Sequence, residues 1–222
     1  MNVRNKPRPS GDQVSDLTAG RLSVYLRCLT HLEAAGVRTT SSTALAAQFH
    51  LNAAQIRKDL AYFGEFGVRG VGYYVSPLKN HLRAILGLDH QVRVAILGAG
   101  NLGLALADYQ GFRKEGFSIV ALFDTAAGKI GQHSRKGVPI LDARDFEPQA
   151  RAGGIDIVVI AVPGDAAQPV AELAVRCGIR AILNFSPGTL KVPAGVKLKN
   201  VDLTVSLESL SFFLARGDAD GA

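Results

Sequence analysis

A glycine-rich segment in the second half of the chain carries the clearest chemistry in the sequence. Its GxGxxG spacing follows an apolar run and opens a helix-like stretch, the context that a dinucleotide-binding turn requires. The first glycine permits a tight turn, the second lets the backbone approach a pyrophosphate, and the third lets the helix pack on the strand. Free amides at the helix start attract the pyrophosphate. The six residues are Gly98, Ala99, Gly100, Asn101, Leu102 and Gly103.

An aspartate at the end of the next apolar run supplies the second part of this chemistry. Asp124 lies about 20 residues after the last glycine, where dinucleotide-binding folds carry an acidic residue that accepts hydrogen bonds from the adenosine ribose. Its charge would repel a 2′-phosphate, so the sequence favours NAD(H) over NADP(H). The alternative at this point is a tight glycine turn with no ligand.

Two later loops also follow apolar runs and should lie at the same edge of the sheet, beside the nicotinamide. Both loops are apolar with few polar groups. Their alternative interpretation is as ordinary turns at strand ends. The predicted contacts are Ala161, Val162 and Pro163 in the first loop and Asn184, Phe185, Ser186 and Pro187 in the second.

The sequence offers no proton donor and acceptor near these loops, which a dehydrogenase needs. All five histidines precede the last two apolar runs, and the residues after Ser186 are too few for a substrate domain. We therefore expect a protein that binds a dinucleotide without turning it over, and not an enzyme. Two alternatives remain: an NAD-dependent enzyme with an N-terminal partner-binding module, and a CoA-binding Rossmann protein, although Asp124 suits the 3′-phosphate of CoA poorly.

A second group of residues, in the N-terminal part of the chain, suits nucleic acid. Between residues 52 and 64 apolar side chains repeat every three or four positions and leave a cationic face on the other side of a helix. Such a face can enter the major groove, where Arg57 suits a guanine edge or a phosphate, Lys58 a phosphate and Gln55 an adenine. Each cation alone could equally be a solvated surface residue. The candidate DNA contacts are Ser42, Gln55, Arg57, Lys58, Tyr62 and Arg69.

Charge and composition agree with a nucleic-acid partner. The chain has 222 residues and a formal charge of +6, and residues 1–90 carry +5 of it against +1 for residues 91–222. A basic part beside a near-neutral one suggests that the basic part meets a polyanion. The sequence shows no apolar run long enough to span a bilayer, no secretion signal and no metal-ligand spacing around Cys28 or Cys177. We therefore expect a cytoplasmic protein with two buried cysteines, no metal and no membrane contact.

The elements that must position the cationic face predict a winged helix-turn-helix domain over residues 16–88. Residues 1–15 lack an apolar pattern and predict a flexible arm. Three helices follow, and the third begins at Asn52, which has the spacing of a capping box with Gln55. Residues 65–75 predict a β-hairpin, the wing, with an arginine near its tip and suited to the minor groove or the DNA backbone.

The glycine-rich segment lies in a predicted doubly wound α/β domain, a Rossmann fold, over residues 91–204. Apolar runs alternate with helix-like stretches, and runs that are apolar on both faces are typical of a buried parallel sheet. A helix over 102–113 should follow the glycines. The predicted strands span residues 92–98, 118–124, 138–141, 156–162 and 180–186.

The tail of the chain, residues 201–216, predicts a short strand and then a helix over residues 205–216. One face of that helix is apolar. Because no further domain remains to cover the apolar face, we expect it to meet a second copy of the chain.

Six segments of the chain together carry a family resemblance. They are residues 55–67 (QIRKDLAYFGEFG), 69–73 (RGVGY), 98–103 (GAGNLG), 107–109 (ADY), 184–187 (NFSP) and 206–214 (SLESLSFFL). These segments closely resemble the Rex redox-sensing transcriptional repressors. The resemblance extends from about Leu22 to Leu214; the segment 55–67 is long and specific, whereas the glycine motif adds little by itself.

The resemblance implies a homodimer whose winged-helix domains bind palindromic operators and whose Rossmann domains sense the NADH/NAD+ ratio. It also implies release from DNA by NADH and a C-terminal helix exchanged between subunits. One departure is visible: Gln110 stands before Gly111-Phe112, where the family's pattern has Pro or a similar small turn residue. This departure leaves the local shape of that helix end open.

On this basis we expect an apolar pocket that favours neutral NADH over cationic NAD+. Val162, Pro163 and Phe185 would line the pocket, and Phe213 of the partner subunit would close it. Binding of NADH would rotate the subunits so that the two recognition helices no longer match their half-sites. The residues that we expect to exchange partners between the two states are Arg21, Tyr109 and Asp202.

Overall fold

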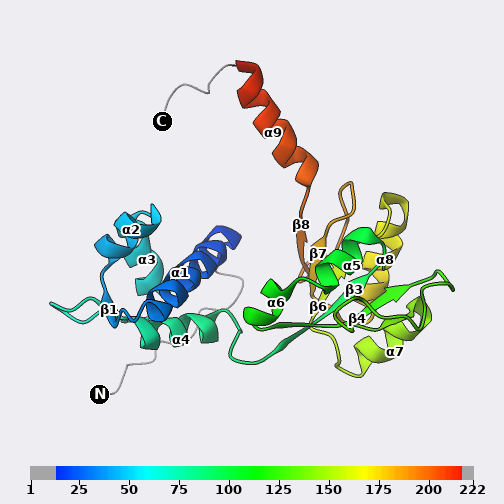
Figure 1. Cartoon of the computed structure of the whole chain (residues 1–222), viewed down its shortest axis with the longest axis horizontal. Helices are drawn as coiled ribbons and strands as arrows, with labels where there is room; N and C mark the ends of the chain where they lie inside the picture. The colour runs from blue at the N-terminus through cyan, green and yellow to red at the C-terminus, as the bar shows by residue number, and fades with distance from the viewer. Residues whose placement is uncertain (1–13, 217–222) are drawn as a thin grey trace. The chain divides into compact units, whose positions relative to one another are not determined.

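The structure is a computed structural model that describes residues 14–216, and the chain divides into two compact units between His90 and Gln91 (Figure 1). The predicted arm lies outside the described residues except for its last two positions. Ser15, one of these, is the N-cap of the first helix and accepts a hydrogen bond from the Thr18 N–H (3.1 Å). In the described part of the chain no helix is long and apolar enough to cross a membrane.

The described part of the first unit contains four helices and a two-stranded antiparallel sheet. Its elements are α1 (Asp16–Ala34), β1 (Thr39–Thr40), α2 (Ser42–Phe49), α3 (Ala53–Phe63), β2 (Tyr73–Tyr74) and α4 (Val75–Ile85). Asn52 caps α3 by accepting the Gln55 N–H (2.9 Å). The Gln55 side chain turns to Asp59 instead of back to Asn52, so the predicted capping box is only half formed.

Apolar stripes on α1, α3 and α4 form the buried core of the first unit. Complete burial of one such side chain contributes about 1.5–3 kcal/mol to folding. The stripe predicted for α3 is confirmed at Ile56 and Leu60, whereas Phe63, its third predicted member, is only half-buried. The predicted burial of Cys28 is confirmed. The buried residues are Leu22, Leu26, Cys28, Leu29 and Leu32 of α1, Ile56 and Leu60 of α3, and Val75, Leu78 and Leu82 of α4.

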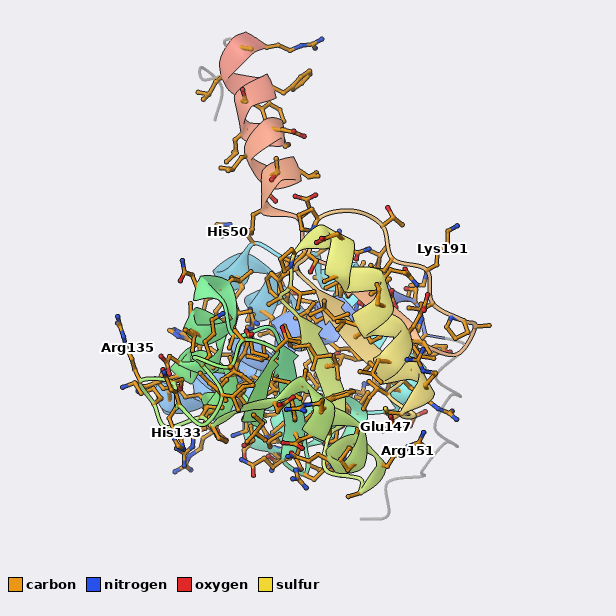
Figure 2. The ribbon with its side chains drawn as sticks, turned by 90° about the vertical axis from the view of Figure 1, so that its right-hand side faces the viewer. His50, His133, Arg135, Glu147, Arg151 and Lys191 are labelled. Atoms are coloured by element: carbon orange, nitrogen blue, oxygen red, sulfur yellow. The ribbon has the colours of Figure 1, made fainter. Side chains whose placement is uncertain are left out.

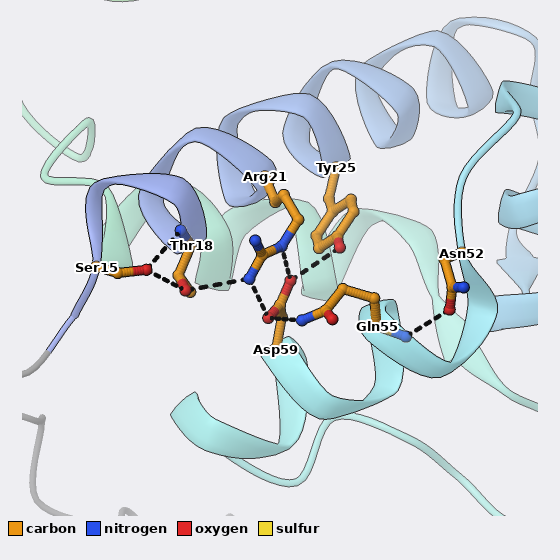
Figure 3. A network of polar contacts seen from close by, with 7 residues as sticks. All are labelled: Ser15, Thr18, Arg21, Tyr25, Asn52, Gln55 and Asp59. Carbon is orange, nitrogen blue, oxygen red and sulfur yellow. Dashed lines mark hydrogen bonds and ion pairs between the residues drawn. The ribbon is translucent and has the colours of Figure 1, made fainter.

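A buried aspartate ties α1 to α3 (Figure 3). Asp59, which is 4% exposed, accepts hydrogen bonds from Arg21 Nε (2.6 Å) and Nη2 (2.8 Å), the Tyr25 hydroxyl (2.9 Å) and the Gln55 amide (2.7 Å). Burial would raise the pKa of Asp59, but the hydrogen bonds from Arg21, Gln55 and Tyr25 outweigh it and hold that pKa below its ordinary value. Asp59 therefore remains ionised at neutral pH and holds α3 against α1.

The wing is shorter than the sequence predicts. Among the described residues of the segment 65–75, a single antiparallel bridge between Val68 and Gly72 joins the two arms, and Arg69 lies in the turn between them. Strand β2 pairs instead with β1, ahead of α2. Gly72 has φ +92°, and a Cβ there would collide with the Thr40 carbonyl, so this return of the chain requires glycine.

The second unit is a six-stranded parallel sheet flanked by helices (Figure 1). Its elements are β3 (Val92–Leu97), α5 (Asn101–Ala107), α6 (Gln110–Lys114), β4 (Phe117–Asp124), β5 (Ile140–Asp142), η2 (Ala143–Asp145), α7 (Phe146–Arg151), β6 (Ile157–Ile160), α8 (Gly164–Arg176), β7 (Ala181–Asn184), β8 (Lys197–Asn200) and α9 (Leu203–Arg216).

The strands lie in the order β5-β4-β3-β6-β7-β8, and every neighbouring pair is parallel. Helices α7 and α8 cover the face that carries Leu97, Phe123 and Ile160, a cluster that also buries Cys177. Helix α5 contacts β3 on the other face, where Ile96 lies beside the start of the helix. Helices on both faces confirm the predicted doubly wound α/β fold.

The helix predicted over 102–113 is wrong, because the chain breaks between α5 and α6. Tyr109 lies at the break, and its ring sits over Gly111, where any Cβ would collide with it. The same ring packs edge-on against Phe112, with 5.0 Å between centroids. Gln110, the residue that departs from the family's pattern, therefore begins a separate short helix.

The strand predicted at residue 201 is also wrong, since β8 covers residues 197–200 and α9 begins at Leu203. Asp202 accepts the Thr204 N–H (2.8 Å) at the start of that helix. Every side chain of α9 is exposed (Figure 2). Its large apolar residues are between 51% and 78% exposed: Leu203, Val205, Leu207, Leu210, Phe212, Phe213 and Leu214.

Replacing Asp59 with alanine should destabilise the first unit by about 2–4 kcal/mol, because the change leaves Arg21 without its counter-charge and Tyr25 without its acceptor. Urea unfolding followed by circular dichroism measures the loss. Glu33→Ala is the matched control, since it removes the more exposed ion pair with Lys79 between α1 and α4, which solvent screens, and should cost clearly less. Equal losses in the two variants would contradict the structural role of Asp59.

The phenol of Tyr25 should make stability fall at alkaline pH. Burial, together with the hydrogen bond to Asp59, raises the pKa of Tyr25 to about 12, above the value of about 10 in an unfolded chain. The stability that the protonated phenol contributes is therefore present below about pH 10 and lost as the pH rises to about 12, on the order of 2 kcal/mol in total. Urea midpoints across this window should fall less steeply in Tyr25→Phe; parallel declines would refute the prediction.

Candidate functional site

The exposed face of α3 carries the cations that the sequence predicts. Arg57, Lys58 and Tyr62 are all exposed, opposite the buried stripe of the helix. The Arg57 guanidinium donates to the Ser42 hydroxyl on α2 (2.9 Å). Since a guanidinium has five N–H donors, this one bond steadies the side chain and still permits recognition of a base or phosphate. Arg69 is exposed at the tip of the wing.

Two of the predicted DNA contacts lie differently. Ser42 is only 7% exposed, and its hydroxyl accepts from Arg57. Gln55 is half-buried, and its amide donates to Asp59 (2.7 Å). The sequence predicts that both side chains face DNA. In the structure each instead contacts a charged neighbour, Ser42 contacting Arg57 and Gln55 contacting Asp59.

The glycine-rich loop joins β3 to α5 through close contacts between bare backbones. A Cβ at Gly103 would collide with the Gly98 carbonyl, and a Cβ at Gly98 would collide with the Ala161 carbonyl. A Cβ at Gly100 would point into open space, the direction from which a ligand can approach the backbone. No side chain caps α5, so a pyrophosphate can accept hydrogen bonds from its first amides.

Asp124 lies beside this loop, and both of its carboxylate oxygens accept hydrogen bonds. Oδ2 accepts the Ala99 N–H (2.8 Å) and the Lys129 ammonium (3.2 Å), and Oδ1 accepts the Ala126 N–H (2.8 Å). Burial would raise the pKa of Asp124, but the hydrogen bonds from Ala126, Ala99 and Lys129 outweigh it and hold that pKa below its ordinary value. The carboxylate is therefore ionised at neutral pH, as an acceptor for ribose hydroxyls must be.

Buried polar side chains join the two strand-end loops. Asn184, which is 1% exposed, accepts the Ser186 N–H (2.9 Å) and donates to the Ser186 carbonyl (3.1 Å) and to Asn200 (3.0 Å). The Ser186 hydroxyl donates to the Val162 carbonyl (2.6 Å). Asn184 and Ser186 thus shape the loops from within. The residues of these loops that remain half-buried or exposed are Ala161, Val162, Pro163, Phe185 and Pro187.

The glycine-rich loop, Asp124 and the first strand-end loop come together at the carboxyl ends of β3, β4 and β6. The order of the strands reverses between β3 and β6, which is where open α/β sheets bind ligands. The residues fit a dinucleotide, with bare backbone for the pyrophosphate, a carboxylate for the ribose and apolar side chains for the nicotinamide. Within residues 14–216 no cluster of His, Cys, Asp and Glu could hold a metal ion.

The residues predicted to exchange partners have different surroundings. Arg21 is bound to Asp59 on α3, and Asp202 caps α9. Tyr109 is 61% exposed at the α5–α6 break. Phe213, which is predicted instead to close the nicotinamide pocket of the partner subunit, is 53% exposed on α9.

Sequence reasoning missed two charged residues of these sites. Asp59 had a usable signal, because it lies three positions after Ile56 on the apolar side of α3, and a charge on a buried stripe needs partners. Lys129 had none, since it lies in an irregular segment with no periodic pattern.

Comparison with known protein families gives two matches. The family described as putative DNA-binding protein N-terminus matches residues 13–61, in the first unit. The family described as CoA binding domain matches residues 89–188, from just before β3 to just after β7.

Relatives and solved structures match over nearly the whole chain. The redox-sensing transcriptional repressor Rex of Desulfitobacterium hafniense is 47% identical, covering 90% of this chain and 95% of the relative, and that of Syntrophomonas wolfei is 49% identical, covering 91% and 96%. The structure of RSP with β-NAD+ and operator DNA has a TM-score of 0.87 at 41% identity, covering 92% of this chain and 94% of RSP. RSP with β-NADH has a TM-score of 0.81 at 40% identity, covering 93% and 96%. The chain belongs to the Rex family of redox-sensing transcriptional repressors.

Proposed function

We propose that this protein is a DNA-binding transcriptional repressor that senses the NADH/NAD+ ratio, binds palindromic operators as a homodimer and is released by NADH. The observation that carries the proposal is the union, in one chain, of an exposed cationic helix and a bare glycine loop beside Asp124. The names of the relatives and the complexes of RSP with β-NAD+, β-NADH and operator DNA support the same function.

The DNA-binding part is the winged-helix domain, residues 16–88. Helix α3 enters the major groove with Arg57, Lys58 and Tyr62, and Arg69 on the wing reaches the minor groove or the backbone. Ser42 acts here mainly by holding Arg57. Behind the helix, the hydrogen bonds of Asp59 hold α3 against α1, so that the exposed cations of α3 form one surface.

The dinucleotide-binding part is the Rossmann domain, residues 91–204. The bound coenzyme supplies a nicotinamide that is cationic when oxidised and neutral when reduced. The glycine loop binds its pyrophosphate, Asp124 accepts from its ribose, and Val162, Pro163 and Phe185 disfavour the cation because they offer it no counter-charge. Since equal affinity for the two forms would shift no equilibrium, this apolar lining is what makes the site a sensor.

The protein is a regulator and not an enzyme, as the names of its relatives indicate. The family matching the second unit is named for CoA, and CoA remains the alternative ligand. Asp124 argues against it, because a carboxylate repels the 3′-phosphate of CoA. Such a repressor works in the cytoplasm, where both the coenzyme and the chromosome are found.

Two chains associate through α9, with residues 205–216 of each chain docking on the other. The exposed apolar side chains of α9 support this assembly, since such a helix needs a partner surface. Phe213 of the partner subunit then closes the nicotinamide pocket. Arg21, Tyr109 and Asp202 exchange partners as NADH rotates the subunits and misaligns the two α3 helices.

Arg57→Ala should weaken operator binding by about 1–3 kcal/mol, because it removes a bidentate donor from the groove-facing side of α3. Fluorescence anisotropy at fixed salt, with a duplex that the protein selects from a random pool, measures the loss. Ser42→Ala should weaken operator binding less than Arg57→Ala does, since Arg57 keeps its charge in that variant. Arg176→Ala, at an exposed cation on α8, is the control; if Arg57→Ala binds as tightly as this variant, α3 is not the recognition helix.

NADH should dissociate the operator complex, whereas NAD+ should leave it intact. Gly103→Val should bind NADH at least about tenfold more weakly, because its side chain would collide with the Gly98 carbonyl and displace the loop. This variant should stay on the operator at NADH concentrations that release the wild-type protein. Gel shifts measure both effects. Operator binding by the wild-type protein that ignores saturating NADH would defeat the proposed function.

A further inference from the structure

A lysine lies next to the carboxylate that discriminates the ribose. The Lys129 ammonium is 3.2 Å from Asp124 Oδ2, and the same oxygen also accepts the Ala99 N–H. The Asp124 side chain is 13% exposed, whereas that of Lys129 is 44% exposed. The lysine side chain is therefore accessible to solvent, whereas the carboxylate that it contacts is largely buried.

The turn that carries Lys129 is well defined by its own hydrogen bonds. The Lys129 N–H donates to the Ala126 carbonyl (2.9 Å), and the Gln132 N–H donates to the Lys129 carbonyl (3.1 Å). The Gln132 amide closes the turn on the Gly128 carbonyl (2.6 Å). These bonds hold the lysine backbone in the turn after β4, from which its side chain reaches Asp124.

We propose that Lys129 is a specificity-determining residue. Its ammonium is a cation suited to the 2′-phosphate of a dinucleotide, and Asp124 keeps that ammonium neutralised. This inference rests on the proposed function, because it concerns the adenosine ribose of the same coenzyme. In the wild-type chain a 2′-phosphate would face an ion pair with no net charge, and it would have to compete with Asp124 for the ammonium. A ribose without phosphate meets no such competition, since its hydroxyls can donate to Asp124.

The ion pair therefore makes selectivity depend on both partners. Removing only the negative charge of Asp124 leaves a cation beside the ribose, and an ammonium–phosphate contact is among the stronger hydrogen bonds in proteins. Removing both charges leaves nothing to attract the phosphate. The present preference for NAD(H) is thus held by one carboxylate against a site that is otherwise ready for NADP(H).

Fluorescence titrations with NADH and with NADPH test this proposal on the full-length protein. Asp124→Asn keeps the shape of the side chain and an acceptor for the Ala99 N–H; it should bind NADPH on the order of tenfold more tightly than the wild-type protein does, and NADH more weakly. Adding Lys129→Met should abolish the gain for NADPH. Lys136→Met is the matched control, since it removes an exposed lysine from the same connection between β4 and β5 and should change neither affinity.

Two results would overturn the role of Lys129. One is a gain for NADPH that survives in the double variant; the other is the lack of any gain in Asp124→Asn while NADH still binds. If Asp124→Asn binds neither coenzyme, Asp124→Ser takes its place, and no gain there also overturns the role. Failure of the wild-type protein to bind NADH at all would instead refute the proposed function.

Discussion

The second unit depends on a contact between bare backbones. The chain leaves β3 at Gly98, where φ is +108° and a side chain would collide with the carbonyl of Ala161. Gly103, in the first turn of α5, lies against Gly98 itself. Because β3 and β6 are the two central strands, this contact joins both halves of the sheet. The loop that would hold a pyrophosphate is therefore part of the packing of the sheet, and it cannot move without disturbing that packing.

Both units use an aspartate in the same way. Asp59 holds α3 from behind through Arg21 and Tyr25, and Asp124 holds the glycine loop through the Ala99 N–H. In each case the hydrogen bonds from several donors lower the pKa of the carboxyl by more than burial raises it, so the carboxylate stays ionised inside the protein. The helix that we propose to meet DNA and the loop that we propose to meet the coenzyme are thus each supported by an ionised carboxylate.

Elements whose signal is local could be predicted from the sequence, whereas contacts between distant segments could not. The buried stripe of α3 follows from its helical spacing, and five of the six described strands of the sheet follow from continuous apolar runs, which strands buried on both faces require. The contacts of Asp59 with Arg21 and of Arg57 with Ser42 depend on how helices pack, and no periodicity reports that. The break before α6 was also missed, although the contact found there is local: the Tyr109 ring lies over Gly111, and the apolar pattern does not report it.

The exposure of α9 has a genetic consequence if that helix joins two copies as we propose. A chain with a damaged α3 would keep its apolar α9. It would therefore pair with intact chains and form mixed dimers that do not bind the operator. Such a mutation would behave as dominant in a cell that makes both forms. A chain that ends before Leu203 would lack α9 and would not pair with intact chains, so its defect would be recessive.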